Sequence, residues 1–475
     1  MKTVPLKFFG GVISLAILVI GGIALALSQR NVAKQTVGTI PNDPLVAVNN
    51  SATLPQGEIV YLVNTLTPGP PRPITYALIF RQLGNGVSSS HPLNATEITA
   101  DYANLLFGCT FSPNGQYVLL KQGRPQGGFG SYRIFFWDRK TKHLEPGPVA
   151  RINYQQTAWS PTSDAIAYVL GGTPEGWEEQ GNKPTSLHVW NLKTGKDHLV
   201  VENPQEGIFT WTQRGTLLFP YKAEDADASK TPILRHPSVY EASTTGGTAL
   251  EIIQDGYNPL PSPDDRFIAF LGWSKATKRP TRDKSDVQHQ NLDLNRRGEV
   301  FGLYLFERKT GMRHLIHALK LGEAPDTVLW SQDSKSLYSI QSTYTDKQPP
   351  YIKSSDSNIY PGSGQGQIYA VDVTTLKQMA VATLLATDAM ARPDPQSQFA
   401  FKGISADGAY LYVLVNELRD DGPIHGYLAI SRTLYSIDLR LHSAYPVWTT
   451  EKAEGIDWRE TKPALPDVPR QKSLQ

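Results

Sequence analysis

The strongest constraint on the fold is a short line of sequence that recurs along the chain. An aromatic or apolar residue precedes Ser or Thr, often Pro, then a polar turn, then a run of strand-forming residues. The copies align on residues 48 to 74 positions apart, namely Ser112, Ser160, Thr212, Ser262, Ser331 and Ser405. A second line, such as GLYLFERKTGMRHLI from Gly302, follows each copy. An internal period of this length indicates a repeat architecture.

Each repeat has the composition of four short strands. The apolar run before the turn predicts the first strand, and the alternating Tyr, Val, Ala and Leu after it predict the second. In the turn, Pro fixes φ, while Gly or Asn accepts a positive φ. The second line predicts a third strand, a turn and a fourth strand. One such sheet cannot bury both of its faces, so the repeats are expected to pack around a ring as the blades of a β-propeller.

Six repeats carry both lines, and the two ends of the chain supply a seventh. GEIVYLVNTL from Gly57 and TYALIFRQLGNG from Thr75 match the second and third strands of a blade without its inner strand. GIDWRE, residues 455–460, matches an inner strand alone. Pairing of the two would close the ring and remove an exposed edge. The sequence therefore predicts an all-β, seven-bladed propeller over residues 57–460, with six blades as the alternative count.

The repeat resembles the TolB-type, WD-repeat-like β-propeller family. Trp159-Ser160-Pro161 and Ser262-Pro263-Asp264 match the first turn of that family, and Arg308-Lys309-Thr310-Gly311 matches the later turn. Thr212-Gln213-Arg214-Gly215 lacks the proline, and Leu376-Lys377 replaces Thr-Gly. The matching residues are structural, so the resemblance implies the fold and says little about function. Members of the family include periplasmic binding partners, protein scaffolds and the propeller halves of serine peptidases.

The N-terminal segment predicts a location outside the cytoplasm. Lys2 and Lys7 precede an uncharged, apolar run of 20 residues, 8–27, which is long enough as a helix to cross a bilayer. The lysines favour a cytoplasmic N-terminus. Residues 1–28 are therefore interpreted as a signal anchor or transmembrane helix, with a cleaved signal peptide as the alternative because of Ala24-Leu25-Ala26. Residues 29–56 are expected to form a linker, and residues 461–475 a C-terminal tail.

Charge and cysteine content restrict the possible ligands. The net charge is +2, without blocks of like charge, so nucleic acid is not expected as a partner. Cys109 is the single cysteine, which excludes an internal disulfide, and it is expected to be a buried strand thiol. No cofactor or metal site is predicted.

Candidate binding residues lie in insertions between the second and third strands of several blades. These insertions, near 171–185, 272–299, 342–366 and 416–432, should emerge on one face of the ring, where binding loops are usually found. Basic and tyrosine-rich compositions suggest a surface that binds a protein or glycan. The candidates are Trp177, Lys275, Lys278, Arg279, Arg282, Arg296, Arg297, Tyr344, Tyr351 and Tyr360.

The motifs of common enzymes are missing from the sequence, and no catalytic residue is predicted. No G-x-S-x-G or H-E-x-x-H pattern is present. The favoured function is a membrane-tethered, extracytoplasmic module that binds a protein or a cell-envelope polymer without catalysis. A propeller-type enzyme (lactonase, lyase or glycan hydrolase) with its site at the central channel, and a sensory or structural ectodomain of an envelope complex, are the alternatives. Trp159, Trp211 and Trp330 are expected to be largely buried between blades.

Overall fold

The computed structural model describes most of the predicted propeller and none of the N-terminal segment. The chain divides into two compact units, Met1–Ala47 and Val48–Gln475, and every described residue belongs to the second. The described residues are 57–66, 74–83, 85–93, 105–123, 131–151, 157–170, 185–204, 207–221, 236–275, 299–319, 327–344, 353–354, 357–358, 360–361, 364–386, 390–391, 399–419, 428–450 and 453–459. Among them is no helix long and apolar enough to span a membrane. The predicted anchor, linker and tail lie outside these residues.

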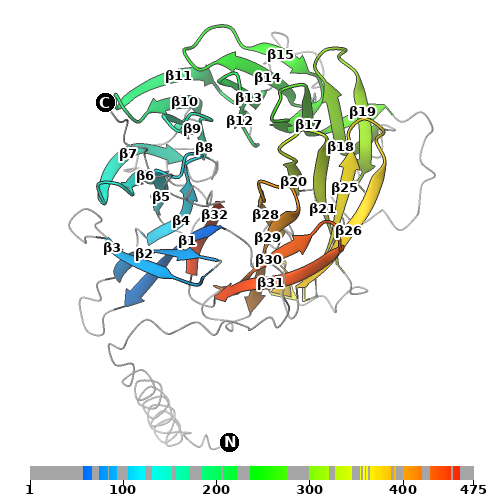
Figure 1. Ribbon diagram of the computed structural model, residues 1–475. Helices are drawn as coiled ribbons and strands as arrows, with labels where there is room; N and C mark the ends of the chain where they lie inside the picture. The colour runs from blue at the N-terminus through cyan, green and yellow to red at the C-terminus, as the bar shows by residue number, and fades with distance from the viewer. Residues whose placement is uncertain are drawn as a thin grey trace, which may run out of the picture. The chain divides into compact units, whose positions relative to one another are not determined.

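Seven four-stranded antiparallel sheets form the blades of a β-propeller, which confirms the predicted fold and blade count (Figure 1). The strands are given from the inside of the ring outwards. Blade 1 contains β32 (Ala453–Arg459), β1 (Glu58–Leu66), β2 (Ile74–Gln82) and β3 (Ser88–Leu93). Blade 2 contains β4 (Leu105–Phe111), β5 (Tyr117–Gly123), β6 (Ser131–Asp138) and β7 (His143–Arg151). Blade 3 contains β8 (Thr157–Trp159), β9 (Ala165–Leu170), β10 (Ser186–Asn191) and β11 (Lys196–Glu202).

The remaining blades follow the same order. Blade 4 contains β12 (Thr210–Trp211), β13 (Thr216–Tyr221), β14 (Ser238–Ser243) and β15 (Leu250–Ile253). Blade 5 contains β16 (Gly256–Pro261), β17 (Phe267–Lys275), β18 (Glu299–Glu307) and β19 (Arg313–Ala318). Blade 6 contains β20 (Thr327–Trp330), β21 (Ser336–Tyr344), β25 (Gly364–Asp372) and β26 (Gln378–Ala386). Blade 7 contains β28 (Phe399–Ile404), β29 (Tyr410–Arg419), β30 (Leu428–Asp438) and β31 (Ser443–Thr450).

The C-terminal strand closes the ring as the sequence predicted. β32 pairs antiparallel with β1, and Ile59 lies opposite Trp458. The carboxylate of Asp457 accepts a hydrogen bond from the backbone N–H of Phe111 at 2.7 Å, which links the inner strands of blades 1 and 2. The first blade is therefore assembled from both ends of the described chain.

The hydrophobic core is divided among the interfaces between blades. In β5, Val118 and Leu120 pack toward blade 1, whereas Leu119 packs toward blade 3. Each of the seven core clusters joins two neighbouring blades, and the last joins Tyr61 of blade 1 to Trp448 of blade 7. The middle strands are apolar on both faces for this reason, because each face meets another sheet.

Cys109 lies in one of these interfaces, as expected. Its side chain is buried, and the Sγ atom donates to the carbonyl oxygen of Val60 at 3.5 Å. Burial is the main reason that the pKa of the thiol is raised above its ordinary value. The thiol therefore has the environment of a structural cysteine and not that of a nucleophile.

The three tryptophans end inner strands and pack against core clusters between blades, as predicted, with Trp330 the most deeply buried. The indole N–H groups of Trp211 and Trp330 donate to Ala158 and Leu260, each in the inner strand of the preceding blade. Trp330 is buried, but Trp159 and Trp211 are only half-buried. Their inner strands are three and two residues long, so little neighbouring chain covers the indole.

Candidate functional site

The long insertions emerge on one face of the ring. Since antiparallel strands reverse direction, the connections between second and third strands share a face with the connections between blades. In blade 6, β24 (Tyr360–Pro361) from the insertion pairs with β27 (Met390–Ala391) from the connection to blade 7. A short hairpin of β22 (Lys353–Ser354) and β23 (Ser357–Asn358) belongs to the same insertion. This surface is called the insertion-bearing face.

Three of the ten candidate binding residues are placed by the structure, two at the ends of strands that lead into insertions and one in a short strand within an insertion. Lys275 ends β17 opposite Glu299, and Tyr344 ends β21 opposite Gly364. Tyr360 pairs with Ala391. The other seven lie outside the described residues, namely Trp177, Lys278, Arg279, Arg282, Arg296, Arg297 and Tyr351. The grouping of the ten candidates into one binding surface therefore stays a prediction.

An aromatic cluster lies where the longest insertion leaves blade 5. Trp273 near the end of β17 contacts Phe301 near the start of β18 (ring centroids 4.9 Å apart) and Tyr257 on β16 (5.4 Å). Tyr257 stacks on Phe301 at an angle of 6°, and His236, which precedes β14 in blade 4, stacks on Trp273 at 4.0 Å. All four rings are partly exposed. We call these four residues the rim aromatic cluster.

The rim aromatic cluster is held by the backbone beneath it. The N–H of Trp273 donates to the carbonyl of Asp255 at 3.0 Å. Burial raises the pKa of Tyr257 to about 12, so its phenol stays neutral at physiological pH. None of these four residues was a candidate from the sequence, although Trp273 lies within the predicted insertion 272–299. The sequence could have indicated them by their position beside the basic insertion, because binding residues are often found at strand ends next to long loops.

A hydrogen-bonded chain of Ser186, His188 and Asp197 lies on the outer strands of blade 3. Ser186 Oγ is 2.8 Å from His188 Nε2, and His188 Nδ1 is 2.6 Å from Asp197 Oδ2. The phenol of Tyr168 donates to the other oxygen of Asp197 at 3.0 Å. The connectivity is that of a catalytic triad. This chain was not predicted from the sequence, because Ser and His two residues apart on a strand form no recognised motif.

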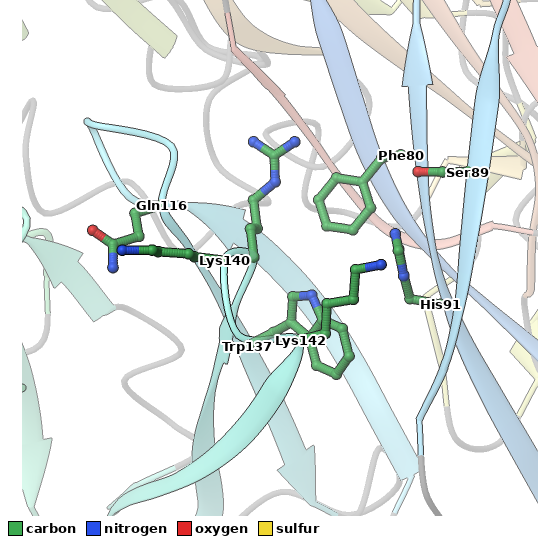
Figure 2. A pocket seen from close by; sticks show the side chains of 8 residues that line it. Phe80, Ser89, His91, Gln116, Trp137, Lys140 and Lys142 are labelled. Atoms are coloured by element: carbon green, nitrogen blue, oxygen red, sulfur yellow. The ribbon is translucent and has the colours of Figure 1, made fainter.

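The opposite face holds a basic pocket between blades 1 and 2, with a volume of about 340 Å³ (Figure 2). Blade 1 contributes Phe80 of β2 together with Ser89 and His91 of β3. Blade 2 contributes residues of its turns, namely Gln116 between β4 and β5, Trp137 at the end of β6, and Arg139, Lys140 and Lys142 between β6 and β7. None of these residues was a candidate from the sequence. The residues from different blades are far apart in the chain, and no motif connects them.

Metal coordination has no support within the described residues. No group of three or more His, Cys, Asp or Glu side chains among them is arranged to hold an ion.

Comparisons with known proteins find only remote structural similarity. No known family profile matches the sequence, and no curated protein matches it either. Among solved structures, TolB from Acinetobacter baumannii is 12% identical over 71% of this chain and 65% of its own, with a TM-score of 0.37. The chain thus spans less than two thirds of that protein.

Two further solved structures have a similarly remote likeness to this chain. The β-propeller domain of the Trilobed protease from Pyrococcus furiosus is 12% identical over 84% of this chain and 98% of its own, with a TM-score of 0.44. Oligogalacturonate lyase from Vibrio parahaemolyticus is 13% identical over 82% of this chain and 86% of its own, with a TM-score of 0.41. At these identities the likeness concerns the fold, and the β-propeller that the TolB-type resemblance implied is confirmed by the seven sheets themselves.

Proposed function

We propose that the protein is a non-catalytic binding module outside the cytoplasm, which takes a protein or a cell-envelope polymer on its insertion-bearing face. The rim aromatic cluster is the observation that carries this proposal. Partly exposed aromatic rings supply large contact areas at little cost in conformational entropy, and they are enriched where proteins bind partners. The cluster lies on a rigid ring, so its rings are positioned before the partner arrives.

The basic insertion supports the same face. Residues 276–298 leave blade 5 just after Trp273 and return just before Phe301, so a partner at the ends of the insertion also meets the cluster. The apolar segment 8–27 supports a membrane tether that would hold this module in the cell envelope.

Replacement of the insertion tests the proposal. Lys275 and Glu299 are directly paired across β17 and β18, so an Asn-Gly turn can join them without disturbing the sheet. We expect the full chain with this replacement to lose its principal crosslinked partner in intact envelopes. A companion variant replaces residues 171–185, which contain the candidate Trp177, by the same turn, since Leu170 and Ser186 are also directly paired. Retention of the partner by the variant that lacks residues 276–298 would contradict the proposal.

The Ser186–His188–Asp197 chain favours one alternative, a hydrolase that uses a serine nucleophile. However, Ser186 lies in β10, with β9 and β11 on its two sides. The backbone amides there serve the sheet, whereas a triad requires amides directed at the developing oxyanion. A fluorophosphonate probe separates the two cases. Labelling that disappears in Ser186→Ala would establish the hydrolase, and we expect no labelling.

A further inference from the structure

Three cationic side chains, Arg139, Lys140 and Lys142, line the basic pocket between blades 1 and 2, and only Arg139 is paired with a carboxylate of the described residues. Arg139 is engaged, because its guanidinium donates to Glu58 Oε1 at 2.8 Å and to the carbonyl of Gly115 at 3.0 Å, and it lies over the ring of Phe80. Lys140 and Lys142 are exposed and form no ion pair with any carboxylate of the described residues. Their two charges therefore face the pocket without compensation.

The histidine of the pocket reports this positive field. Burial, followed by the charges of Lys142 and Arg139, lowers the pKa of His91 below its ordinary value. His91 is consequently neutral at physiological pH and can both donate and accept a hydrogen bond. Figure 2 shows Lys142 extending between Phe80 and Trp137 toward His91, whereas Lys140 extends toward Gln116.

The types of donor favour one anion over another. A planar carboxylate is best matched by the fork of an arginine, but the fork of Arg139 is already occupied by Glu58 and Gly115. The remaining donors are separate points: two ammonium groups, the Ser89 hydroxyl, the His91 imidazole and the Gln116 amide. Point donors that approach from several directions suit a tetrahedral anion with oxygens on every side.

The size of the pocket indicates that the anion is part of a larger molecule. A volume of about 340 Å³ is at the lower end of the range for small-molecule sites and exceeds what a phosphate ion fills. The walls formed by Phe80 and Trp137 offer apolar surface to a carbon skeleton.

We propose that this pocket binds the phosphate ester of a small polyol or sugar. The phosphate lies at the end formed by Lys142, His91 and Ser89, and the polar remainder of the ligand reaches Lys140 and Gln116. This site is on the face opposite the insertions, so it is independent of the partner-binding function proposed above. The ester can be a free metabolite or the headgroup of a membrane lipid.

The backbone conformation of Lys142 allows a substitution that removes its charge without destabilising the fold. Its φ of 58° is left-handed, and glycine occupies the equivalent turn position at Gly195 and Gly311. Lys142→Gly therefore removes the charge while it relieves backbone strain, so the fold should not lose stability. The control is Lys309→Ala, because Lys309 occupies in blade 5 the turn position that Lys140 occupies in blade 2, away from any residue of the pocket.

The test measures binding of glycerol 3-phosphate to the purified full chain by calorimetry, with galacturonate as the carboxylate probe. We expect saturable binding of glycerol 3-phosphate, weaker binding of galacturonate, and a dissociation constant raised about tenfold or more by Lys142→Gly but unchanged by Lys309→Ala. Absence of saturable binding, equal affinity of Lys142→Gly and the wild type, or a preference for galacturonate would overturn the proposal.

Vesicles distinguish the two sources of the ester. Cosedimentation with phosphatidylglycerol vesicles that is reduced by Lys142→Gly and unaffected by Lys309→Ala would assign the site to a lipid headgroup. Binding of glycerol 3-phosphate without sedimentation that depends on Lys142 would assign it to a free ester. Both results support the phosphate-ester site.

Discussion

The fourth residue of each turn between first and second strands has a left-handed backbone conformation. Three blades place glycine there, and the others place Ser163, Asp265 and Ser334, all with φ near 60°. Each of these three side chains accepts a hydrogen bond from a backbone N–H in the turn of the preceding blade, as Ser163 does from Asn114 at 2.9 Å and Ser334 from Asp264 at 3.1 Å. A strained conformation is therefore used to connect neighbouring blades.

Substitution of Ser163 separates the hydrogen bond from the backbone strain. Ser163→Ala keeps the left-handed strain of the wild type and leaves the N–H of Asn114 without its partner, which should cost about 1 kcal/mol. Ser163→Gly loses the same bond but relieves strain of about 1 kcal/mol, so its stability should lie close to that of the wild type. Chemical denaturation measures both free energies of unfolding. Equal stability of Ser163→Ala and the wild type would show that the bond between blades contributes nothing.

In the turns of blades 6 and 7, the first serine is the main cause that lowers the pKa of a nearby carboxyl. The hydroxyl of Ser405 donates to Asp407 at 2.6 Å and is the main reason that the pKa of this carboxyl is below its ordinary value. Asp333 has the same relation to Ser331. A carboxyl with a lower pKa in the folded than in the unfolded protein stabilises the fold above the unfolded pKa. That stabilisation disappears as the pH falls through the folded pKa.

We therefore expect Ser405→Ala to change the pH dependence of stability. The variant should show a higher Asp407 pKa by NMR titration, and it should lose less stability than the wild type when the pH falls below about 4. Asp372, whose carboxyl is bound by Thr375 and not by a turn serine, is the internal control. A change at Asp372, or no change at Asp407, would contradict the assigned cause.

At the scale of strands, the repeat predicts which segments pair but not where the register of the pairing shifts. The turn at Ser112 and the strand after it were predicted from the sequence, because Pro, Asn and Gly have strong local preferences. In blades 2 to 7, however, a register shift interrupts the pairing of third and fourth strands, as between Leu303 and Tyr304. Such bulges increase the local twist, and no particular residue type marks them in these strands.

Gly302 shows how closely these strands approach. A Cβ atom added there would lie 2.2 Å from the carbonyl oxygen of His317, whereas one added at Gly311 would meet nothing within 4 Å. Gly302→Ala should therefore destabilise the fold by roughly 3 kcal/mol through overpacking. Gly311→Ala, with a left-handed φ of 70°, should cost only about 1 kcal/mol. If Gly311→Ala unfolded at the lower temperature of the two, β19 would be able to shift away from the methyl group added at Gly302 at little cost.

At the scale of the whole molecule, sites form where blades meet. The sequence predicted the ring because the repeat is local, yet it could not bring His91 beside Lys142, since His91 lies in a strand of blade 1 and Lys142 in a turn of blade 2. The rim aromatic cluster likewise joins His236 of blade 4 to Trp273 of blade 5. Local preferences specify a blade, whereas these surfaces depend on which side chains the packing of blades places together.

Closure of the ring is the contact on which the whole assembly depends. A chain that ends at residue 452 lacks β32, so it exposes the edge of β1 and removes Asp457 from the N–H of Phe111. An unpaired edge and a broken interface should lower the midpoint of thermal unfolding by about 10 °C or more and promote association of edges between molecules. Differential scanning calorimetry and light scattering measure the two effects.

Two controls make this prediction specific to closure. A chain that ends at residue 460 keeps β32 and should unfold at the wild-type temperature. Asp457→Ala keeps the strand but removes the partner of the Phe111 N–H, so its midpoint should lie between the two because a buried donor without a partner costs about 1–3 kcal/mol. If the chain ending at residue 452 unfolded at the same temperature as the chain ending at residue 460, the strand would not hold the ring together, and the stability of blade 1 would come from its contact with blade 7 at Tyr61 and Trp448.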